Sequence, residues 1–181
     1  MLSAAQAHKL LQESELICSE KEVTTAVQRV AKEITDALHD THPLVLSVMG
    51  GAVIFTGQLL PLLNFPIDFD YLHVTRYGDE TRGGDLSWIV APRAQVEGRI
   101  VLVLDDILDE GITLSVIKQR LLGSGAAACH TAVFANKNIG RSKPIEADFI
   151  GVELPNRFVF GFGMDIQGAW RNLPAVYAVR D

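Results

Sequence analysis

The sequence predicts an α/β protein with a mainly parallel central sheet flanked by helices. Short apolar runs of strand length alternate along the chain with segments of helical periodicity, and glycine-containing turns separate several of them. Strands that alternate with helices are typical of parallel sheets, because each crossover returns the chain to the same edge. Ligands of such sheets bind beyond the carboxyl ends of the strands, so we expect a site there.

The first forty residues are predicted to be helical. Apolar residues recur at helical spacing between Val23 and Leu38, and Ser19 with Glu22 three positions later forms a capping box. The next unit is a strand, PLVLSV at 43–48, followed by the glycine turn MGGA and a helix over 53–63 that Pro61 shortens or kinks. We expect the first helical segment to serve only packing.

The middle of the chain continues the alternation. IDFDYLHV at 67–74 has the period of a strand, and WIVAP at 88–92 resumes strand character. The polar, glycine-rich stretch between them, RYGDETRGGDLS, has the composition and length of a lid.

The second half of the chain contains the strongest strand signal, RIVLVLDD at 99–106. A helix, TLSVIKQRLLGSG, ends in glycines, and the strand HTAVFAN follows at 130–136. The tail from residue 148 is predicted to be strand and loop. Neither a repeat nor a linker interrupts the 181 residues, which therefore predict a single domain.

Composition excludes several classes of function. The net charge of −6 disfavours a nucleic-acid binder, and no apolar stretch is long enough to cross a bilayer, which argues against a membrane role. The amino terminus lacks a secretory signal, so we expect a cytoplasmic protein. Cys18 and Cys129 lie far apart and neither has a CxxC partner, which favours reduced structural thiols. The five histidines show no metal-ligand spacing, so we interpret them as surface or core residues.

Acidic residues gather in VLVLDDILDEGITL at 101–114. Asp105 and Asp106 fall where the buried strand emerges from the core, and two adjacent carboxylates suit a divalent cation or a hydroxyl-rich ligand. Gly111 permits unusual backbone angles and Thr113 can begin a helix, so backbone N–H groups of the turn can converge on an anion. Together these features indicate a phosphorylated sugar. The simpler alternative is a solvated turn whose acids favour a helix start.

The whole pattern is more specific than its parts. Acid, acid, two aliphatics, Asp, any residue, Gly, any residue and Thr resembles the 5-phosphoribosyl-1-pyrophosphate (PRPP) motif of the type I phosphoribosyltransferases. The neighbouring motifs are similar to the hypoxanthine-guanine branch, from about Leu46 to the carboxyl terminus. The resemblance implies the type I phosphoribosyltransferase fold, a small hood built from parts of 1–20 and 150–181, and a mobile lid at about 75–87.

The resemblance also assigns roles in PRPP binding. Asp105 and Asp106 would hold the ribose hydroxyls and Mg²⁺, and Asp109 would be the general base for the purine N7 proton. The turn from Asp109 to Thr113 would cradle the 5′-phosphate. The residues implied to bind PRPP are Gly50, Gly51, Asp105, Asp106, Asp109, Glu110, Gly111, Ile112, Thr113 and Arg171.

Three of these positions depart from the family pattern. Gly50 stands where relatives often have a basic residue before a glycine, in a loop with a non-proline cis peptide, so pyrophosphate contacts would rest on backbone amides. Ile112 often has a polar or basic counterpart, and Glu110 replaces a small hydroxyl residue. A carboxylate facing a phosphate repels it, so Glu110 is expected either to turn outward or to weaken PRPP binding.

The remaining motifs supply the lid and the base site. In the lid, Tyr77 matches the family's tyrosine, whereas Arg76 stands where serine is usual; both are assigned catalytic roles with Asp109. Lys137 matches the contact to the purine 6-oxo group, Phe158 the stacking aromatic and Val159 the backbone partner of the base. The residues implied to bind purine are Ile107, Lys137, Phe158, Val159 and Asp165, and those implied to bind metal are Asp105, Asp106 and Asp165.

The resemblance implies a Mg²⁺-dependent purine salvage enzyme that converts hypoxanthine or guanine plus PRPP to IMP or GMP plus pyrophosphate, acting as a homodimer or homotetramer. Two alternatives remain. The departures at Gly50, Glu110 and Ile112 would also fit a non-catalytic PRPP-binding regulator. A phospho-receiver domain likewise gathers acids after a strand, although usually near its amino terminus.

Overall fold

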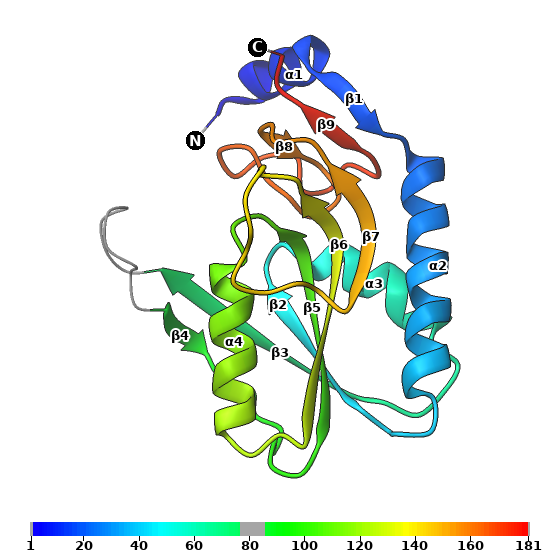
Figure 1. The fold of residues 1–181 in the computed structure, drawn as a ribbon. Helices are drawn as coiled ribbons and strands as arrows, with labels where there is room; N and C mark the ends of the chain where they lie inside the picture. Colours follow the sequence, from blue (N-terminus) through cyan, green and yellow to red (C-terminus); the bar gives the residue numbers. More distant parts are fainter. Residues whose placement is uncertain (1, 77–85, 181) are drawn as a thin grey trace.

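The computed structural model describes residues 2–76 and 86–180 and confirms the α/β class (Figure 1). Its central sheet has the strand order β4-β3-β2-β5-β6-β7, and every neighbouring pair is parallel except β3 with β4. The six strands are β2 Leu44–Met49, β3 Asp68–Arg76, β4 Leu86–Val90, β5 Ile100–Leu108, β6 Ala128–Lys137 and β7 Phe149–Leu154.

Helices cover both faces of the sheet (Figure 1). One face packs against α2 (Glu20–Leu38) and α3 (Val53–Leu59), and the other against α4 (Ile112–Gly123). Successive side chains of a strand point to opposite faces. In β5, the fully buried Leu102 and Leu104 therefore join the core beneath α2 and α3, and the equally buried Val101 and Val103 join the core beneath α4.

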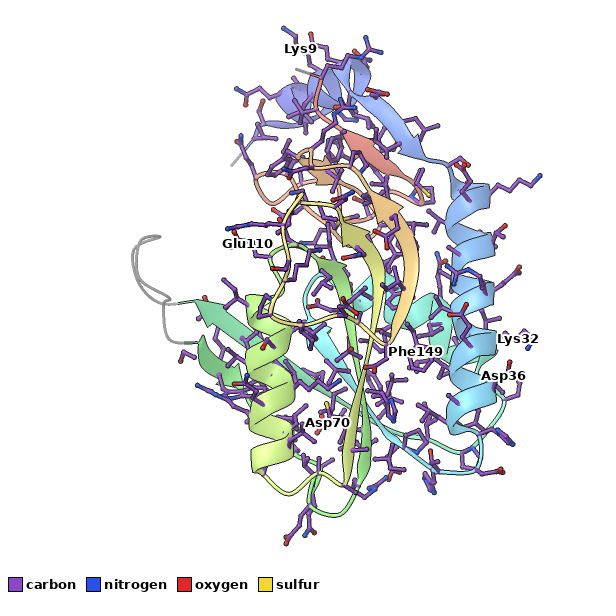
Figure 2. All side chains as sticks on the ribbon, in the orientation of Figure 1. Lys9, Lys32, Asp36, Asp70, Glu110 and Phe149 are labelled. Carbon is purple, nitrogen blue, oxygen red and sulfur yellow. The ribbon has the colours of Figure 1, made fainter. Side chains whose placement is uncertain are left out.

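The helical periodicity between Val23 and Leu38 falls within α2, and Ser19 and Glu22 form its capping box as predicted. Its buried residues include Val23, Val27 and Ile34, whereas its exposed face has charged pairs such as Lys32 with Asp36 (Figure 2). None of the helices in the two described stretches is long and apolar enough to cross a membrane.

The amino-terminal region is not helical throughout, which corrects the sequence prediction. Helix α1 (Ala4–Glu13) is followed by β1 (Glu15–Cys18), which pairs antiparallel with β9 (Val176–Ala178). With β8 (Val159–Phe160) these strands form a second sheet, which lies beyond the carboxyl ends of the central strands (Figure 1). Strand β1 is too short to show alternation, and its partner lies at the other end of the chain.

Two element ends matter for the site. The α-helix α3 stops at Leu59 and continues as a 3₁₀ turn over Leu60–Leu62, consistent with Pro61 lacking an N–H donor. Strand β5 runs two residues further than predicted, because it stays paired with β6 as far as Leu108 opposite Asn136. The pairing places the end of β6 beside the turn that follows β5.

Candidate active site

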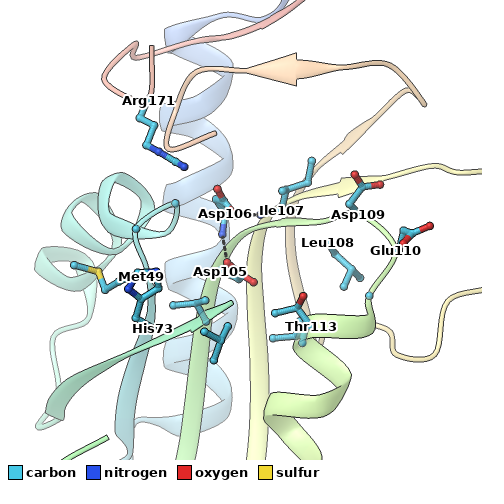
Figure 3. A pocket seen from close by; sticks show the side chains of 16 residues that line it. Met49, His73, Asp105, Asp106, Ile107, Leu108, Asp109, Glu110, Thr113 and Arg171 are labelled. Atoms are coloured by element: carbon cyan, nitrogen blue, oxygen red, sulfur yellow. Dashed lines mark hydrogen bonds between the residues drawn. The ribbon is translucent and has the colours of Figure 1, made fainter. Parts of the chain in front are cut away.

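A cavity of about 340 Å³ lies at the carboxyl ends of β2, β3 and β5, beside the start of α4 (Figure 3). We call it the turn cavity, because the 109–113 turn forms one wall. It brings together residues that the sequence predicted for the site: Gly50, Gly51, Asp105, Asp106, Ile107, Asp109, Glu110, Gly111, Thr113 and Arg171. Ile112 is not among the lining residues; it is partly exposed at the first position of α4.

A second cavity of about 200 Å³ adjoins the turn cavity and is named here the aromatic cavity, after Phe158 at its edge. All five residues predicted to bind purine line it: Ile107, Lys137, Phe158, Val159 and Asp165. Its wall is shared with the turn cavity through Asp106, Ile107, Asp109 and Arg171. One ligand can therefore extend from the first cavity into the second past the Asp106 and Asp109 carboxylates.

Two of the predicted catalytic positions lie at or beyond the limit of the description. Arg76 ends β3, but its side chain is outside what the structure describes. Tyr77, and most of the predicted lid at 75–87, lie outside the described residues.

Asp105 and Asp106 lie side by side in β5, and local hydrogen bonds orient both carboxylates. The Asp106 N–H donates to Oδ1 of Asp105 at 3.0 Å, and the Ile107 N–H donates to Oδ1 of Asp106 at 2.8 Å. Burial raises the pKa of Asp105 well above its usual value, and the charge of Asp106 adds to this effect. Burial also raises the pKa of Asp106. Ionising the pair is therefore costly unless a cation or hydroxyl donors offset the charge.

The carboxylates fit a cation that arrives with its ligand better than a closed metal centre. Within the described residues, no group of three or more His, Cys, Asp or Glu side chains is placed to hold a metal. Mg²⁺ is commonly held through one or two carboxylates together with substrate phosphates, and Asp105 and Asp106 offer that donor set. Asp165 is already engaged, because it pairs with Arg171 and accepts the Gly168 N–H at 2.7 Å.

Glycines allow the segments around Asp106 to touch. A Cβ atom at Gly51 would lie 1.9 Å from Oδ2 of Asp106, and one at Gly163 would lie 2.1 Å from the backbone oxygen of Gly51. Gly163 also has a φ of 101°, and its backbone oxygen accepts from Nη1 of Arg171 at 2.6 Å. Arg171 is thereby held over the acidic pair (Figure 3). The Met49–Gly50 peptide bond is cis, as in the loop that the sequence resembles.

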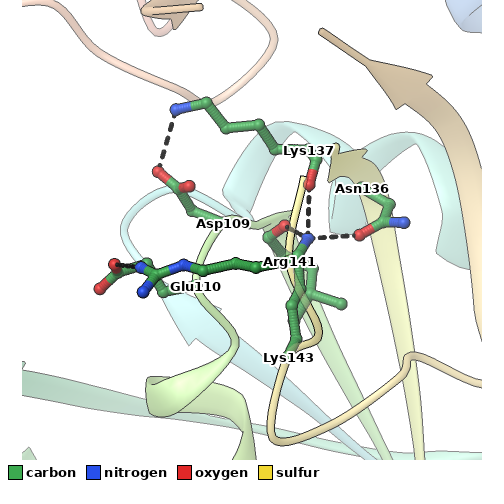
Figure 4. Close-up of polar contacts among 7 residues, drawn as sticks. Asp109, Glu110, Asn136, Lys137, Arg141 and Lys143 are labelled. Atoms are coloured by element: carbon green, nitrogen blue, oxygen red, sulfur yellow. Dashed lines mark hydrogen bonds and ion pairs between the residues drawn. The ribbon is translucent and has the colours of Figure 1, made fainter. Parts of the chain in front are cut away.

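The turn after β5 ends in a helix N-terminus that faces the turn cavity. Gly111 adopts a φ of 80° as the N-cap of α4, and its carbonyl accepts the Ser115 N–H at 3.0 Å. Among the described residues no side chain caps this helix, and a helix start of this kind attracts an anion through its backbone N–H groups. Glu110 does not obstruct them, because its Oε1 accepts from Nη2 of Arg141 at 2.5 Å (Figure 4). The Glu110 carboxylate points toward Arg141, while the residue itself still lines the turn cavity.

Two predicted site residues are bonded to each other. Nζ of Lys137 donates to Oδ2 of Asp109 at 3.1 Å (Figure 4). The Lys137 side chain is only 14% exposed, whereas that of Asp109 is 50% exposed. The largely buried Lys137 side chain therefore extends from β6 to the Asp109 carboxylate, which lies at the junction of the two cavities.

Sequence reasoning missed two residues here. Its pattern indicates that His73 is a surface or core histidine, but it lines the turn cavity in the second half of β3, opposite Met49. Its place two residues before the expected lid could have revealed it, since the carboxyl ends of parallel strands share an edge. Lys143 was not singled out either, although its ammonium group contacts the ends of both β5 and β6.

Asp105→Asn is expected to stabilise the purified protein in the absence of Mg²⁺. Because folding raises the pKa of Asp105, the folded protein loses stability as the pH rises through that pKa. The asparagine side chain does not ionise and so avoids this loss, and its Oδ1 can still accept the Asp106 N–H. We expect the thermal midpoint to rise by a few degrees at pH 7, with a smaller gain at pH 5.

Asp148→Asn provides a control of opposite sign. Burial opposes ionisation of Asp148, but hydrogen bonds from Thr131 and the charge of Lys118 hold its pKa below the usual value. Its stabilisation is present at neutral pH and lost on acidification, so this variant should have a lower thermal midpoint at pH 7. A lower midpoint for Asp105→Asn as well would contradict the account of the acidic pair.

Comparisons with known proteins agree with the geometry. A family model described as the phosphoribosyl transferase domain matches residues 17–167. The chain is 33% identical over 162 residues to the hypoxanthine-guanine phosphoribosyltransferase of Bacillus subtilis, covering 89% of this chain and 90% of that protein. It is also 33% identical over 168 residues to the protein of the same name from Aquifex aeolicus, covering 92% and 94%.

Solved structures show the same fold. A hypoxanthine phosphoribosyltransferase from Staphylococcus aureus superimposes with a TM-score of 0.89 over 95% of both chains, at 22% identity. The hypoxanthine phosphoribosyltransferase from Trypanosoma cruzi, solved as a ternary substrates complex of a mutant, gives a TM-score of 0.85 at 30% identity, over 93% of this chain and 97% of that one.

Proposed function

The chain belongs to the phosphoribosyltransferase family, and from that premise we propose that it transfers the phosphoribosyl group of PRPP to hypoxanthine or guanine in purine salvage. The observation that best supports this is the junction of the two cavities at Asp106 and Asp109. A helix N-terminus and an acidic pair suit a ribose phosphate on one side, and a lysine with an exposed aromatic ring suits a 6-oxopurine on the other. The names of the relatives support the same activity.

PRPP would occupy the turn cavity. The backbone N–H groups at the start of α4 and the Thr113 hydroxyl would bind the 5′-phosphate, and Asp105 and Asp106 would accept from the ribose hydroxyls. The Gly50 and Gly51 amides and Arg171 would hold the pyrophosphate group, since this chain has no side chain at Gly50. Asp105 and Asp106 would hold Mg²⁺, and Asp165, which also bonds to Arg171, would lie near a second ion; the bound metal would supply positive charge that offsets the charge of pyrophosphate.

The purine would occupy the aromatic cavity, with its ring stacked on Phe158 and its edge against Ile107 and Val159. Lys137 would donate to the 6-oxo group. The bond from the anomeric carbon to pyrophosphate oxygen breaks, and the bond from that carbon to N9 forms. Asp109 accepts the N7 proton, and pyrophosphate leaves as the second product. The neighbouring carboxylates favour positive charge at the ribose during the transfer.

We propose that the sheet β1-β9-β8 is the hood, and that the 75–87 segment, with Arg76 and Tyr77, closes over bound PRPP to exclude water. We also propose a cytoplasmic homodimer or homotetramer that binds neither nucleic acid nor membrane.

The two alternatives are less well supported. A non-catalytic regulator is not favoured, because the relatives that cover nearly the whole chain are named as transferases. A receiver domain is not favoured either, because the matching family model spans residues 17–167. The transferase and the regulator are distinguished by measuring pyrophosphate release from PRPP in the presence of Mg²⁺, with and without a 6-oxopurine. Release that depends on the base supports the enzyme, and binding of PRPP without release supports the regulator.

Arg141→Ala is expected to raise the KM for PRPP about two- to fivefold, the range of an exposed ion pair. Without Arg141, the Glu110 carboxylate loses the positive charge that lies 2.5 Å away, and it should repel the 5′-phosphate more strongly. The check is the KM for PRPP of the double variant Arg141→Ala/Glu110→Ser, measured by steady-state kinetics. The double variant should recover the wild-type KM. If it stays as weak as the single variant, Arg141 attracts the phosphate directly and the neutralisation account is wrong.

A further inference from the structure

Lys143 lies in the connection between β6 and β7, and its ammonium group is enclosed by protein oxygens. Nζ donates to the backbone oxygen of Leu108 at 2.7 Å, to Oδ1 of Asn136 at 2.7 Å and to the backbone oxygen of Lys137 at 2.6 Å (Figure 4). A lysine ammonium group has three N–H donors, so these three acceptors use all of them. Lys143 therefore bonds to the protein itself and has no donor left for a ligand.

The acceptors join the two halves of the site. Leu108 is the last residue of β5 and leads into the 109–113 turn, whereas Lys137 is the last residue of β6 and extends its side chain into the aromatic cavity. The pairing of β5 with β6 ends with Leu108 opposite Asn136. Lys143 therefore connects the two strands where their backbone pairing ends. It bonds to Leu108 and Asn136, the last pair, and to Lys137, the next residue of β6.

The segment around Lys143 also packs directly on the turn. A Cβ atom at Gly111 would lie 3.2 Å from Cγ2 of Ile145, 3.4 Å from Cβ of Lys143 and 3.4 Å from Cδ of Pro144. These distances place side-chain atoms of residues 143–145 close to the N-cap of α4. The turn thus lies close to this segment, and Lys143 bonds to Leu108, the residue directly before the turn.

Burial and nearby charges act in opposite directions on the Lys143 ammonium group. Burial lowers its pKa, whereas the charges of Asp109 and Glu153 act in the opposite direction. Glu153 also fixes the acceptor, because both of its carboxylate oxygens accept from Nδ2 of Asn136 at 3.0 Å and so direct Oδ1 toward Lys143. Charge-assisted hydrogen bonds of this kind are short and directional.

We propose that Lys143 is a positioning residue that fixes the turn cavity relative to the aromatic cavity. The inference rests on the proposed function, in which one nucleotide spans both cavities. Lys143 lines neither cavity, so its effect on a ligand passes through the backbone at Leu108 and Lys137. Loss of this link should leave each cavity able to bind its own part of a ligand, but should penalise a ligand that needs both in register.

The test compares two ligands in the full-length Lys143→Met variant, whose side chain is unbranched and one atom shorter and has no donors. GMP spans both cavities in the proposed function, whereas PRPP with Mg²⁺ needs only the turn cavity. Calorimetry should show GMP binding weakened at least about tenfold, and kcat/KM for guanine should fall by about 10- to 100-fold. The dissociation constant of PRPP should change by less than about threefold.

Lys118→Met is the matched control. Lys118 is also a partly buried lysine, 27% exposed, but it bonds to Asp148 at 3.3 Å and lines neither cavity. Both ligands should bind this variant as they bind the wild type. Asn136→Ala, which removes one of the three acceptors of Lys143, should show the same selective loss of GMP binding to a smaller extent, and it serves as the test if Lys143→Met does not fold.

The outcomes separate this inference from the proposed function. The positioning role alone would be overturned if Lys143→Met, or Asn136→Ala where Lys143→Met does not fold, turned over substrate and bound GMP as well as the wild type does. Equal weakening of GMP and PRPP would also overturn it, because it would indicate a general loss of structure. A wild-type chain that binds neither ligand and shows no turnover would overturn the proposed function and this inference with it.

Discussion

Asp109→Asn is expected to lower kcat for hypoxanthine by about 10²- to 10⁴-fold, the usual contribution of a general acid or base. Asp109 lies at the junction of the two cavities and is half exposed, so its carboxylate is accessible to a bound base. The amide keeps an oxygen that can accept from Lys137 but cannot take the N7 proton. The KM for PRPP should therefore change much less than kcat.

Asp68→Asn is the matched control for this variant. Asp68 has nearly the same side-chain exposure, 52%, and also pairs with a basic residue, Arg99, but it lies at the start of β3, at the opposite end from the site. Its kinetics should equal those of the wild type. An undiminished kcat in Asp109→Asn would remove Asp109 from the role of general base.

Discrimination against adenine is the second large effect. The Lys137 ammonium group can only donate hydrogen bonds, so it matches the 6-oxo group of hypoxanthine or guanine and not the 6-amino group of adenine. Because the lysine side chain is 14% exposed, an unmatched donor there is costly. We expect kcat/KM for adenine to be about 10⁴-fold lower than for hypoxanthine, as in sites built to bond one polar group.

Lys137→Met tests the origin of that discrimination. Without the donor, kcat/KM for hypoxanthine should fall while that for adenine stays low, so that the ratio narrows by about 10- to 100-fold. Competition assays with both bases measure the ratio directly. Comparable use of adenine by the wild type would contradict the assignment of Lys137 to the 6-oxo group.

Much of the fold was predictable because its signals are local. The strands over 43–48 and 99–106, the helix begun by Ser19 and the glycine turns each lie within a short window and obey one periodicity. The sheet β1-β9-β8 was not predictable in this way. Its strands have two to four residues, and the pairing of Glu15 with Ala178 joins the two ends of the chain.

The site shows the same division. Residues 105–113 are close in sequence, and the motif predicted their proximity in the site. The contact of Glu110 with Arg141 could not be predicted in this way, because Arg141 is 31 positions away in the β6–β7 connection. The contacts of Lys143 with Leu108 likewise depend on how far β5 and β6 remain paired, which the sequence does not show.

The most direct test of the central claim is product analysis after incubating the purified chain with PRPP, Mg²⁺ and hypoxanthine. If the turn and aromatic cavities form one active site, IMP and pyrophosphate should accumulate in equal amounts, only when hypoxanthine is present, and far more slowly in Asp109→Asn. The account is contradicted if the chain binds PRPP but forms no IMP, or if pyrophosphate is released at the same rate without a base.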